Sequence, residues 1–244
     1  MKLIQLLIFT LLLSWQTITL AGQNKQVLFI GNSYTFTYDV PGLTAKLAQY
    51  NGDKLIFDSS LLGGYQLSQH LEYQVTLQKV AKQQWDHIVL QEFSTKAFNN
   101  YLGFEQSVIL FDSLFKQHNA VKPEQVILYM TWGRQNTQLH PKYPYNLHQQ
   151  ATIDAYNKVA KKLNMQVAPV GLAWRAVRED GDKINLYDAD GTHQSFAGGY
   201  LAACVFYATI FNKSPVGIAF YGELDKKQAL YLQQQAWLAV QSQS

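Results

Sequence analysis

The sequence predicts an α/β protein in which helices cover both faces of a five-stranded parallel sheet. Three observations lead to this fold class. Short apolar runs alternate with segments of helical period, turn residues separate the two, and no internal repeat or interdomain linker interrupts the pattern. Alternation of this kind is typical of right-handed β-α-β crossovers, which build parallel sheets covered on both sides. The five strand candidates are residues 27–30, 54–57, 87–90, 125–130 and 165–170.

The segments between these runs carry apolar residues at helical spacing. Helices are expected over residues 41–50, 67–82, 104–115, 151–163, 195–210 and 225–240. A loop rich in tyrosine and proline, around residues 140–145, precedes the fourth of these helices, and a turn-rich stretch precedes the fifth. Long loops often cover binding sites. The apolar fraction of 48% excludes wholesale disorder and predicts a packed core.

The first 21 residues have the pattern of a secretory signal peptide. A basic Lys2 precedes a leucine-rich core, and a small-x-small triplet ends at Ala21. A membrane anchor is the alternative, but polar residues interrupt the apolar core, which is too short to span a bilayer. We therefore expect cleavage near Ala21, a mature chain of one domain over residues 22–244, and export to a bacterial periplasm or to the medium. No membrane span is expected after cleavage.

Charge and cysteine content narrow the classes of partner. The formal net charge is +3, and cleavage of the leader would remove one lysine and leave +2. So small an excess argues against a nucleic-acid partner. The single cysteine, Cys204, lies inside an apolar run, so no disulfide can form within the chain, and its surroundings favour a small buried hydrophobe over a nucleophile.

The first strand leads into Gly31, Asn32 and Ser33, which form a candidate nucleophile turn. Because a helical segment follows, the pattern is strand, tight turn, helix, and Ser33 falls at the carboxyl end of a strand. Ligands bind at this edge of open α/β sheets. An ordinary capped turn is the plain alternative for these three residues.

A base for this serine is found late in the chain. His193 follows Asp190 by three residues in a tight turn, so the carboxylate can hold the imidazole in one tautomer. Asp188 competes with Asp190 for this role, and either Thr192 or Ser195 could cap the helix that follows. A polar turn without chemistry is the alternative interpretation.

Together these motifs resemble the SGNH (GDSL-type) hydrolase superfamily, in its block order and over residues 27–210. The blocks are Gly31-Asn32-Ser33 after the first strand, Gly63-Gly64 after the second, polar residues after the third, and Asp190-x-x-His193 before a late helix. Members of the superfamily are esterases, lipases, thioesterases and carbohydrate deacetylases with a flavodoxin-like three-layer α/β/α fold. By this resemblance Ser33 is the nucleophile, His193 the base and Asp190 the orienting acid. The N–H groups of Ser33 and Gly64, with Gly63 as the alternative, face the oxyanion.

The sequence departs from the common pattern of the superfamily in two blocks. Asn32 stands where aspartate is usual, and the Gly-x-Asn of the third block is missing. In its place stands Gln-Glu-x-Ser from Gln91 to Ser94, which resembles a divergent bacterial branch. Gln91 carries the same amide on a stem one methylene longer, so it is expected to be the third oxyanion donor, with Ser94 as the fallback.

No cofactor or metal is expected. The sequence contains no phosphate-binding or dinucleotide-binding glycine motif, and its histidines lack the spacing of metal ligands. Glu92 and Arg134 follow neighbouring strands, so the two side chains can form an ion pair near the site or an ordinary surface pair.

The sequence thus predicts an exported serine esterase for small-molecule or carbohydrate esters, with short acyl groups such as sugar O-acetyl favoured. Substrate contacts are expected from Tyr34, Phe93, Ser94 and Trp132. Further aromatic residues in strand-end loops are Phe36, Tyr143 and Tyr145. These rings can equally pack against one another beneath the loops. Three alternatives remain: a lipase or thioesterase of longer chains, a carbohydrate-binding protein with weak catalysis, and an acyltransferase.

Overall fold

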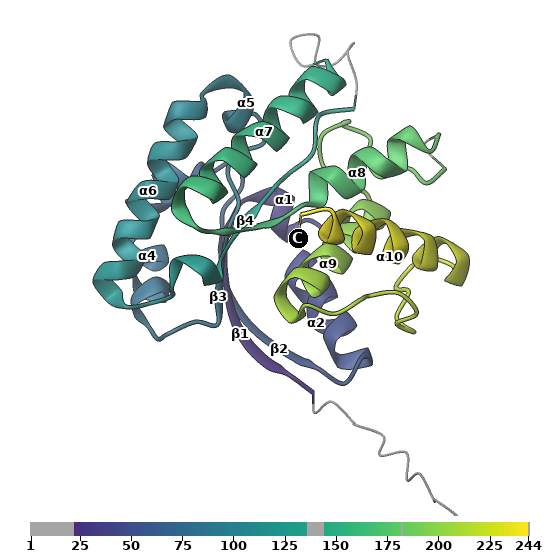
Figure 1. Ribbon diagram of the computed structural model, residues 1–244, viewed down its shortest axis with the longest axis horizontal. Coiled ribbons are helices and arrows are strands. Elements are labelled where there is room, and N and C mark those ends of the chain that lie inside the picture. Colours follow the sequence, from purple (N-terminus) through teal and green to yellow (C-terminus); the bar gives the residue numbers. More distant parts are fainter. Residues whose placement is uncertain (1–21, 136–143, 182, 244) are drawn as a thin grey trace, which may run out of the picture.

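The computed structural model describes residues 22–135, 144–181 and 183–243, and within them all five predicted strands form one parallel sheet (Figure 1). The order across the sheet is β2-β1-β3-β4-β5. The strands are β1 (Asn24–Gly31), β2 (Lys54–Leu61), β3 (His87–Leu90), β4 (Val126–Tyr129) and β5 (Gln166–Ala168). The predicted α/β class with a five-stranded parallel sheet is confirmed.

Strand β1 lies inside the sheet and carries the nucleophile turn at its end. It pairs with β2 from Asn24 to Gly31 and with β3 from Val27 to Ile30. Its apolar residues are fully buried on both faces, as expected for a strand of a parallel sheet with helices on each side. The chain therefore leaves β1 at a position held by neighbours on two sides.

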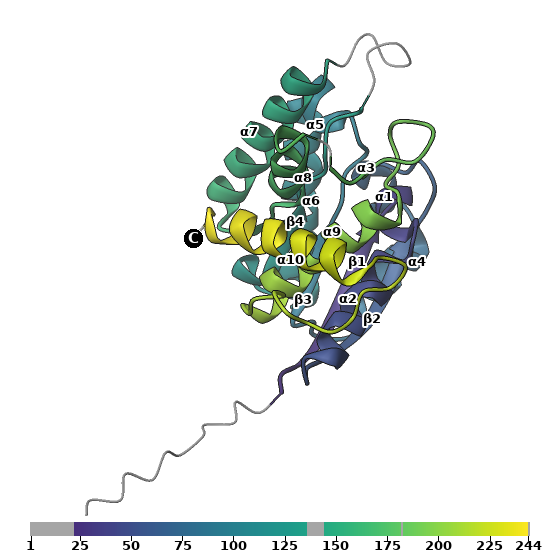
Figure 2. The ribbon, with the colours of Figure 1, turned by 90° about the vertical axis from the view of Figure 1, so that its right-hand side faces the viewer.

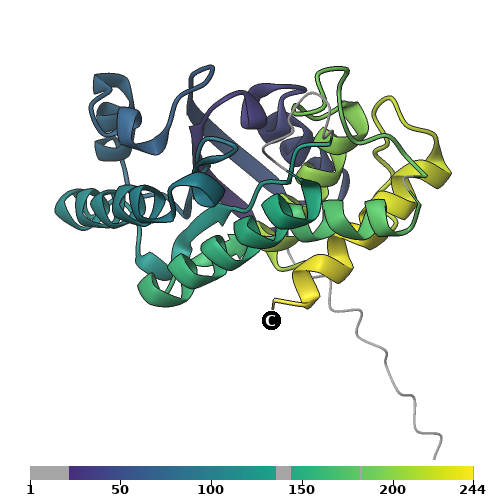
Figure 3. The same ribbon diagram turned by 90° about the horizontal axis from the view of Figure 1, so that it is seen from above.

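Helices cover both faces of the sheet (Figures 2 and 3). On one face lie α2 (Val40–Tyr50), α8 (Val170–Glu179), α9 (Phe196–Phe211) and α10 (Lys226–Gln241). On the other lie α3 (Leu67–His70), α4 (Gln74–Ala81), α6 (Tyr101–His118) and α7 (Tyr145–Leu163). Two short helices, α1 (Ser33–Phe36) and α5 (Lys96–Asn99), follow β1 and β3. Two separate apolar clusters fill the layers, one on each side of the sheet.

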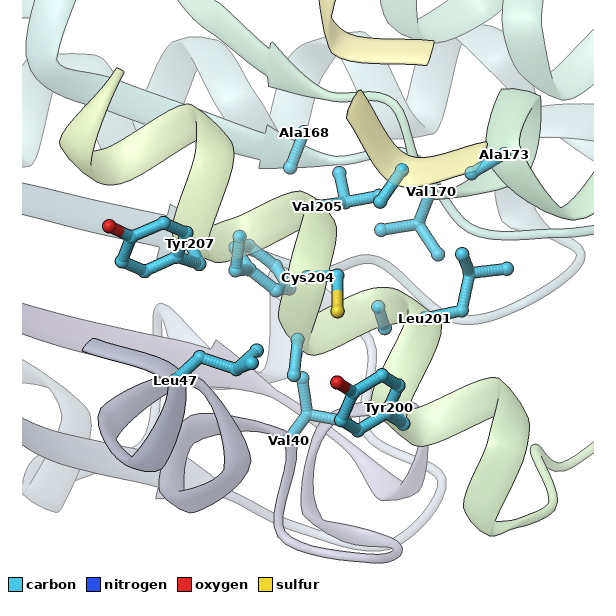
Figure 4. Packing of buried hydrophobic residues seen from close by; sticks show 14 of the residues in the cluster. Val40, Leu47, Ala168, Val170, Ala173, Tyr200, Leu201, Cys204, Val205 and Tyr207 are labelled. Atoms are coloured by element: carbon cyan, nitrogen blue, oxygen red, sulfur yellow. The ribbon is translucent and has the colours of Figure 1, made fainter. Parts of the chain in front are cut away.

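Helix α9 forms the centre of one of these layers. Almost all of its residues are buried, including Cys204, which lies among apolar side chains (Figure 4). Burial raises the pKa of the Cys204 thiol well above its ordinary value. The thiol therefore remains protonated and packs as a small hydrophobic group, in agreement with the sequence.

Two helical predictions were wrong in detail. The expected helix over residues 67–82 is divided into α3 and α4, because the chain turns after His70, whose ring reaches back to the Gly31 carbonyl. Helix α8 was not predicted, although Val170, Ala173, Trp174 and Val177 give it one apolar face and all four are buried. The predicted fifth strand ends at Ala168, two residues early, to make room for this helix.

None of the helices within the described residues is long and apolar enough to cross a membrane. The leader predicted over residues 1–21 lies outside the described residues, as do His140 and Tyr143 of the tyrosine-rich loop.

Candidate active site

Ser33 is the first residue of α1, directly after β1. The Asn32 side chain caps this short helix by accepting a hydrogen bond from the Tyr34 N–H at 3.1 Å. Its carbonyl accepts from the Thr35 N–H at 2.9 Å. The tight strand-to-helix turn expected from the sequence is present, and it leaves the Ser33 side chain half-buried at the carboxyl edge of the sheet.

A line of hydrogen bonds joins three of the predicted residues. The Ser33 hydroxyl lies 2.8 Å from Nε2 of His193, and Nδ1 of the same ring lies 2.5 Å from a carboxylate oxygen of Asp190. Ser33 and His193 are 160 residues apart in sequence. The structure therefore brings the predicted nucleophile, base and acid together.

Asp190 is held by its own turn. One carboxylate oxygen accepts the backbone N–H groups of Thr192 and His193 at 2.8 and 2.9 Å, while the other accepts from the His193 ring. Partial burial opposes ionisation, but these hydrogen bonds outweigh it and lower the pKa of Asp190 to about 2. The carboxylate is therefore ionised at neutral pH.

Within the described residues, Asp188, the competing acid, forms no hydrogen bond with the imidazole. Its carboxylate accepts the N–H of Ala189 at 2.8 Å, and its own N–H donates to the His193 carbonyl at 2.8 Å. Asp188 thus shapes the turn through its backbone, and the contact with the His193 ring belongs to Asp190.

Two aromatic residues expected to contact substrate lie beneath the site. The Tyr34 ring stacks on Trp132 with centroids 4.6 Å apart, and Trp132 stacks on Trp174 at 4.0 Å. Trp132 is fully buried and Tyr34 is 3% exposed, so neither ring offers a face to a ligand. The expectation that Trp132 and Tyr34 form a binding surface was wrong, because the two rings stack on each other and are buried in the apolar core.

This aromatic stack supports the catalytic turn from below. The Trp132 ring N–H donates to the Thr192 carbonyl at 2.9 Å. The rings of Tyr34 and His193 meet edge to face, with centroids 5.4 Å apart. Burial raises the pKa of Tyr34 to about 12, so its hydroxyl stays neutral beside the imidazole. Tyr34 and Trp132 act here as support for His193.

The other predicted contact residues differ in their surroundings. Phe93 is half-buried, Phe36 is 44% exposed, and Tyr145 lies against the Arg178 guanidinium at 3.9 Å. Ser94 is buried, where its hydroxyl accepts from Arg134 at 3.4 Å and its carbonyl accepts from the His148 ring at 3.1 Å. Of these residues, only Ser94 is buried, while Phe36, Phe93 and Tyr145 are exposed or half-buried.

Gln91 occupies a different place from the predicted one. Its side-chain oxygen accepts the Asn32 N–H at 2.8 Å and the Thr35 hydroxyl at 3.0 Å, and its NH₂ group donates to the Glu92 carbonyl. The amide orientation is determined by chemistry, because the Asn32 N–H can only donate. Gln91 is fully buried beneath the turn, so its NH₂ group is not available as a third oxyanion donor.

Glu92 does not pair with Arg134. One oxygen of its carboxylate accepts the N–H groups of Leu67 at 3.1 Å and Phe93 at 2.7 Å, and the other is buried without a hydrogen-bond partner. Burial raises the pKa of Glu92 to about 6, although the two N–H donors act in the opposite direction. The predicted ion pair was therefore wrong, since the carboxylate points inward toward α3.

The glycine pair after β2 is open to solvent. Gly64 has φ +72°, a left-handed conformation that favours glycine, and a methyl group at either glycine would meet no atom within 4 Å. Within the described residues, the N–H groups of Ser33 and Gly64 form no hydrogen bond. Both donors are thus available for a negatively charged oxygen.

Two supporting roles were not predicted from the sequence, one of Asn32 and one of Gln194. The Asn32 NH₂ group donates to the Tyr65 carbonyl at 2.8 Å, which ties the nucleophile turn to the glycine loop. The Gln194 NH₂ group donates to the carbonyls of Tyr34 and Thr37 at 3.2 and 2.8 Å. Adjacency to Ser33 and His193 was the only signal that could have found them.

The described residues contain no group of three histidine, cysteine, aspartate or glutamate side chains placed to hold a metal. His70 and His148 are instead buried with both ring nitrogens in hydrogen bonds to the protein. Each histidine ties together loops at the carboxyl edge of the sheet.

No family model and no curated protein matches this chain. Among solved structures, a DUF4886 family protein from Bacteroides uniformis is similar with a TM-score of 0.74 at 20% identity, covering 89% of this chain and 95% of that one. A candidate SGNH hydrolase from Slackia heliotrinireducens is similar with a TM-score of 0.65 at 25% identity, covering 77% and 99%. An acetyl-xylooligosaccharide esterase from Geobacillus has a TM-score of 0.57 at 17% identity, covering 78% and 95%.

Proposed function

We propose that this chain, which has the SGNH hydrolase fold, is a serine ester hydrolase that works through an acyl-enzyme. One observation carries the proposal: the Ser33 hydroxyl, the His193 ring and the Asp190 carboxylate form a continuous line of hydrogen bonds at the ligand-binding edge of the sheet. A nucleophile within reach of a base that is itself oriented by an acid is the arrangement that acyl transfer requires.

The hydrogen bonds assign a role to each atom. Because Asp190 is ionised, Nδ1 of His193 carries the proton and donates a hydrogen bond to the carboxylate. The lone pair of Nε2 then faces Ser33. Nε2 takes the hydroxyl proton as the serine oxygen attacks the ester carbonyl, and it then gives that proton to the leaving alcohol. Water attacks the acyl-enzyme by the same route in reverse, releasing the acid.

The tetrahedral intermediate carries a negative oxygen that needs hydrogen-bond donors. The N–H groups of Ser33 and Gly64 are proposed for this role, since neither forms a hydrogen bond within the described residues. Because Gln91 is turned inward, the proposed oxyanion site rests on two backbone donors.

Short acyl groups on carbohydrate are the proposed substrates. Two structures of one similar protein, Axe2 from Geobacillus, are named as an acetyl-xylooligosaccharide esterase and an acetylxylan esterase. The floor beside His193 is closed by the buried, stacked rings of Tyr34 and Trp132, so no acyl slot is proposed between them. Export of the mature chain, expected from residues 1–21, would bring it to polysaccharide.

The test is hydrolysis of p-nitrophenyl acetate by the mature chain beside Ser33→Ala and His193→Ala. Both variants should lose activity by several orders of magnitude, since each removes a member of one catalytic unit. Turnover of acetyl and octanoyl esters is measured in parallel, and acetyl should be preferred. A wild type no faster than Ser33→Ala on both esters would contradict the proposal, and a clear preference for octanoyl would contradict the substrate choice.

A matched pair of variants tests the acid. Asp190→Asn keeps an acceptor for the turn but no longer holds the imidazole tautomer, so kcat should fall about 10⁴-fold. Asp188→Asn, two residues away, changes an acid that does not contact the imidazole and should leave kcat unchanged. Equal losses in the two variants would contradict the assignment of Asp190.

A further inference from the structure

Beneath the nucleophile turn lies a buried carboxamide that holds it at two points. The side-chain oxygen of Gln91 accepts the backbone N–H of Asn32, the residue before Ser33, and the hydroxyl of Thr35, two residues after it. A methyl group on Gly31 would lie 2.6 Å from this oxygen, so the glycine is needed to let the amide approach. A single oxygen atom thus anchors the chain on both sides of Ser33.

The next residue, Glu92, holds the glycine loop in the same manner. Its carboxylate accepts the N–H of Leu67, the first residue of α3, three positions after Gly64. On the near side of that loop, the Asn32 NH₂ group binds the Tyr65 carbonyl, directly after Gly64. The loop that carries the Gly64 N–H is therefore fixed at two points, one from the nucleophile turn and one from the end of β3.

Gln91 and Glu92 are also joined to each other and to the sheet. The Gln91 NH₂ group donates to the Glu92 carbonyl, and the Gln91 N–H donates to the Ile30 carbonyl on β1 at 2.9 Å. Both side chains are fully buried. Because the two residues follow a strand packed on β1, they form a rigid support that reaches both donor loops at once.

We infer that Gln91 and Glu92 are positioning residues that jointly hold the Ser33 and Gly64 N–H groups at a fixed separation for the oxyanion. This rests on the proposed esterase function. The pair touches no substrate. It fixes two backbone donors where a side-chain donor is absent, and donors fixed in advance are what makes an oxyanion site effective.

Substitutions at Glu92 separate positioning from charge. Glu92→Leu removes the acceptor for the Leu67 N–H, whereas Glu92→Gln keeps an oxygen on the same stem. With p-nitrophenyl acetate, and with rates counted per titrated active site, Glu92→Leu should lower kcat about 10- to 100-fold at nearly constant KM. Glu92→Gln should restore most of this loss. Inhibition by methylboronic acid, whose serine adduct is tetrahedral, should weaken in parallel with kcat.

A milder pair tests the Gln91 side of the support if the leucine variant does not fold. Thr35→Val removes one donor to the Gln91 oxygen with little change of volume, and Thr35→Ser keeps the hydroxyl. Thr35→Val should lower kcat several-fold and Thr35→Ser should not.

The outcomes distinguish the inference from the function on which it rests. Equal losses in Glu92→Gln and Glu92→Leu, a loss confined to KM, or folded variants with unchanged kcat and boronate affinity would overturn the positioning role alone. A wild type without turnover dependent on Ser33 would overturn the esterase proposal and this inference with it.

Discussion

Asn32 shows how one side chain can serve two loops at once. It is 2% exposed, its oxygen caps α1, and its NH₂ group binds the Tyr65 carbonyl. An aspartate could provide the cap, but it would set a carboxylate oxygen against a carbonyl oxygen at the second contact. The departure from the superfamily pattern at this residue therefore has a structural reason.

Asn32→Asp is expected to impair the protein even though it restores the common residue. Loss of a buried hydrogen bond and burial of a new charge should lower the free energy of unfolding by about 1–3 kcal/mol. Urea denaturation measures this change, with the exposed Asn24→Asp as the control. A free energy of unfolding and a kcat equal to those of the wild type would contradict the role assigned to the NH₂ group.

Glu92 gives the stability a defined dependence on pH. Its pKa is raised by burial from its usual 4.5 to about 6, so the folded state holds the proton more tightly than the unfolded state. A raised carboxyl pKa stabilises the folded state at low pH, and that contribution is lost as pH rises from about 4.5 to about 6. Across this window the loss amounts to about 2 kcal/mol.

Glu92→Gln should remove this dependence. The free energy of unfolding of the variant minus that of the wild type should grow by about 2 kcal/mol between pH 4.5 and pH 7. Urea denaturation at a series of pH values measures the difference, because the variant carries no titrating group at this position. A difference that stays constant with pH would show that Glu92 keeps its ordinary pKa when folded.

How far single residues were predictable depended on the range of their contacts. The contact of Asp190 with His193 lies within one turn of four residues, so spacing alone predicted it. The role of Gln91 depends on whether its amide points toward the substrate or toward the backbone of the nucleophile turn. Both directions are compatible with the same sequence. The prediction for Trp132 was wrong for a similar reason, because an aromatic residue at the end of a strand can face either solvent or the apolar core.

At the scale of elements, the helix that supports the turn of residues 188–193 is α9. Gly198 in its first turn lies so close to the segment before His193 that a methyl group there would be 2.4 Å from the Leu186 carbonyl oxygen and 2.5 Å from Trp174. This close approach sets the distance between α9 and α8. It also sets the position of the segment that leads to His193.

Gly198→Ala should therefore lower the free energy of unfolding by about 1–3 kcal/mol, as overpacked core positions do. Thermal and urea unfolding measure the change. Gly63→Ala is the matched control, because its added methyl meets open space and its unfolding should be unchanged. If both variants unfold like the wild type, α9 can move away from α8 at little cost.

The two helical errors have different physical origins. Helix α8 carries a clear apolar face, so the signal was present and was overlooked beside a strand that ends at Ala168. The division between α3 and α4 has no local signal. It arises because His70 is drawn to the Gly31 carbonyl, a tertiary contact between residues 39 apart in sequence.

At the scale of the whole molecule, an ion pair between the buried Asp53 and the partly exposed Lys213 joins the ends of distant elements. The Asp53 carboxylate accepts hydrogen bonds from the Gln23 N–H, the Tyr207 hydroxyl and the Lys213 ammonium, at 2.7, 2.9 and 2.7 Å. Burial opposes ionisation, but these donors lower the pKa of Asp53. The segment before β1, the start of β2 and the end of α9 are thereby held together.

Lys213→Met should leave the buried Asp53 carboxylate with two of its three donors and lower the free energy of unfolding at pH 7 by about 1–3 kcal/mol. Because a lowered carboxyl pKa stabilises the folded state only above the unfolded pKa, the loss should shrink as pH falls below about 4. Urea denaturation at pH 7 and pH 3 measures both values. Lys82→Met, which breaks a more exposed pair with Asp58, should change the stability by less than about 1 kcal/mol.

The number and parallel direction of the strands followed from the alternation of strand and helix segments in the sequence, because right-handed β-α-β crossovers build parallel sheets. The order of the strands across the sheet was not predicted. The positions of the loops at the carboxyl edge of the sheet could not be predicted from the sequence. They depend on buried side chains, such as those of Gln91 and Glu92, that pack beneath the loops.

The separation of Ser33 from His193 has a consequence for the life of the chain. The nucleophile leaves the ribosome early, but its base is made 160 residues later. Throughout translation the serine is thus an ordinary alcohol, inert toward the esters of the cell that makes it. On the proposed mechanism, ester hydrolysis begins only after residues 190–193 have been synthesised and have folded against Ser33, so a chain that ends before them would be inactive.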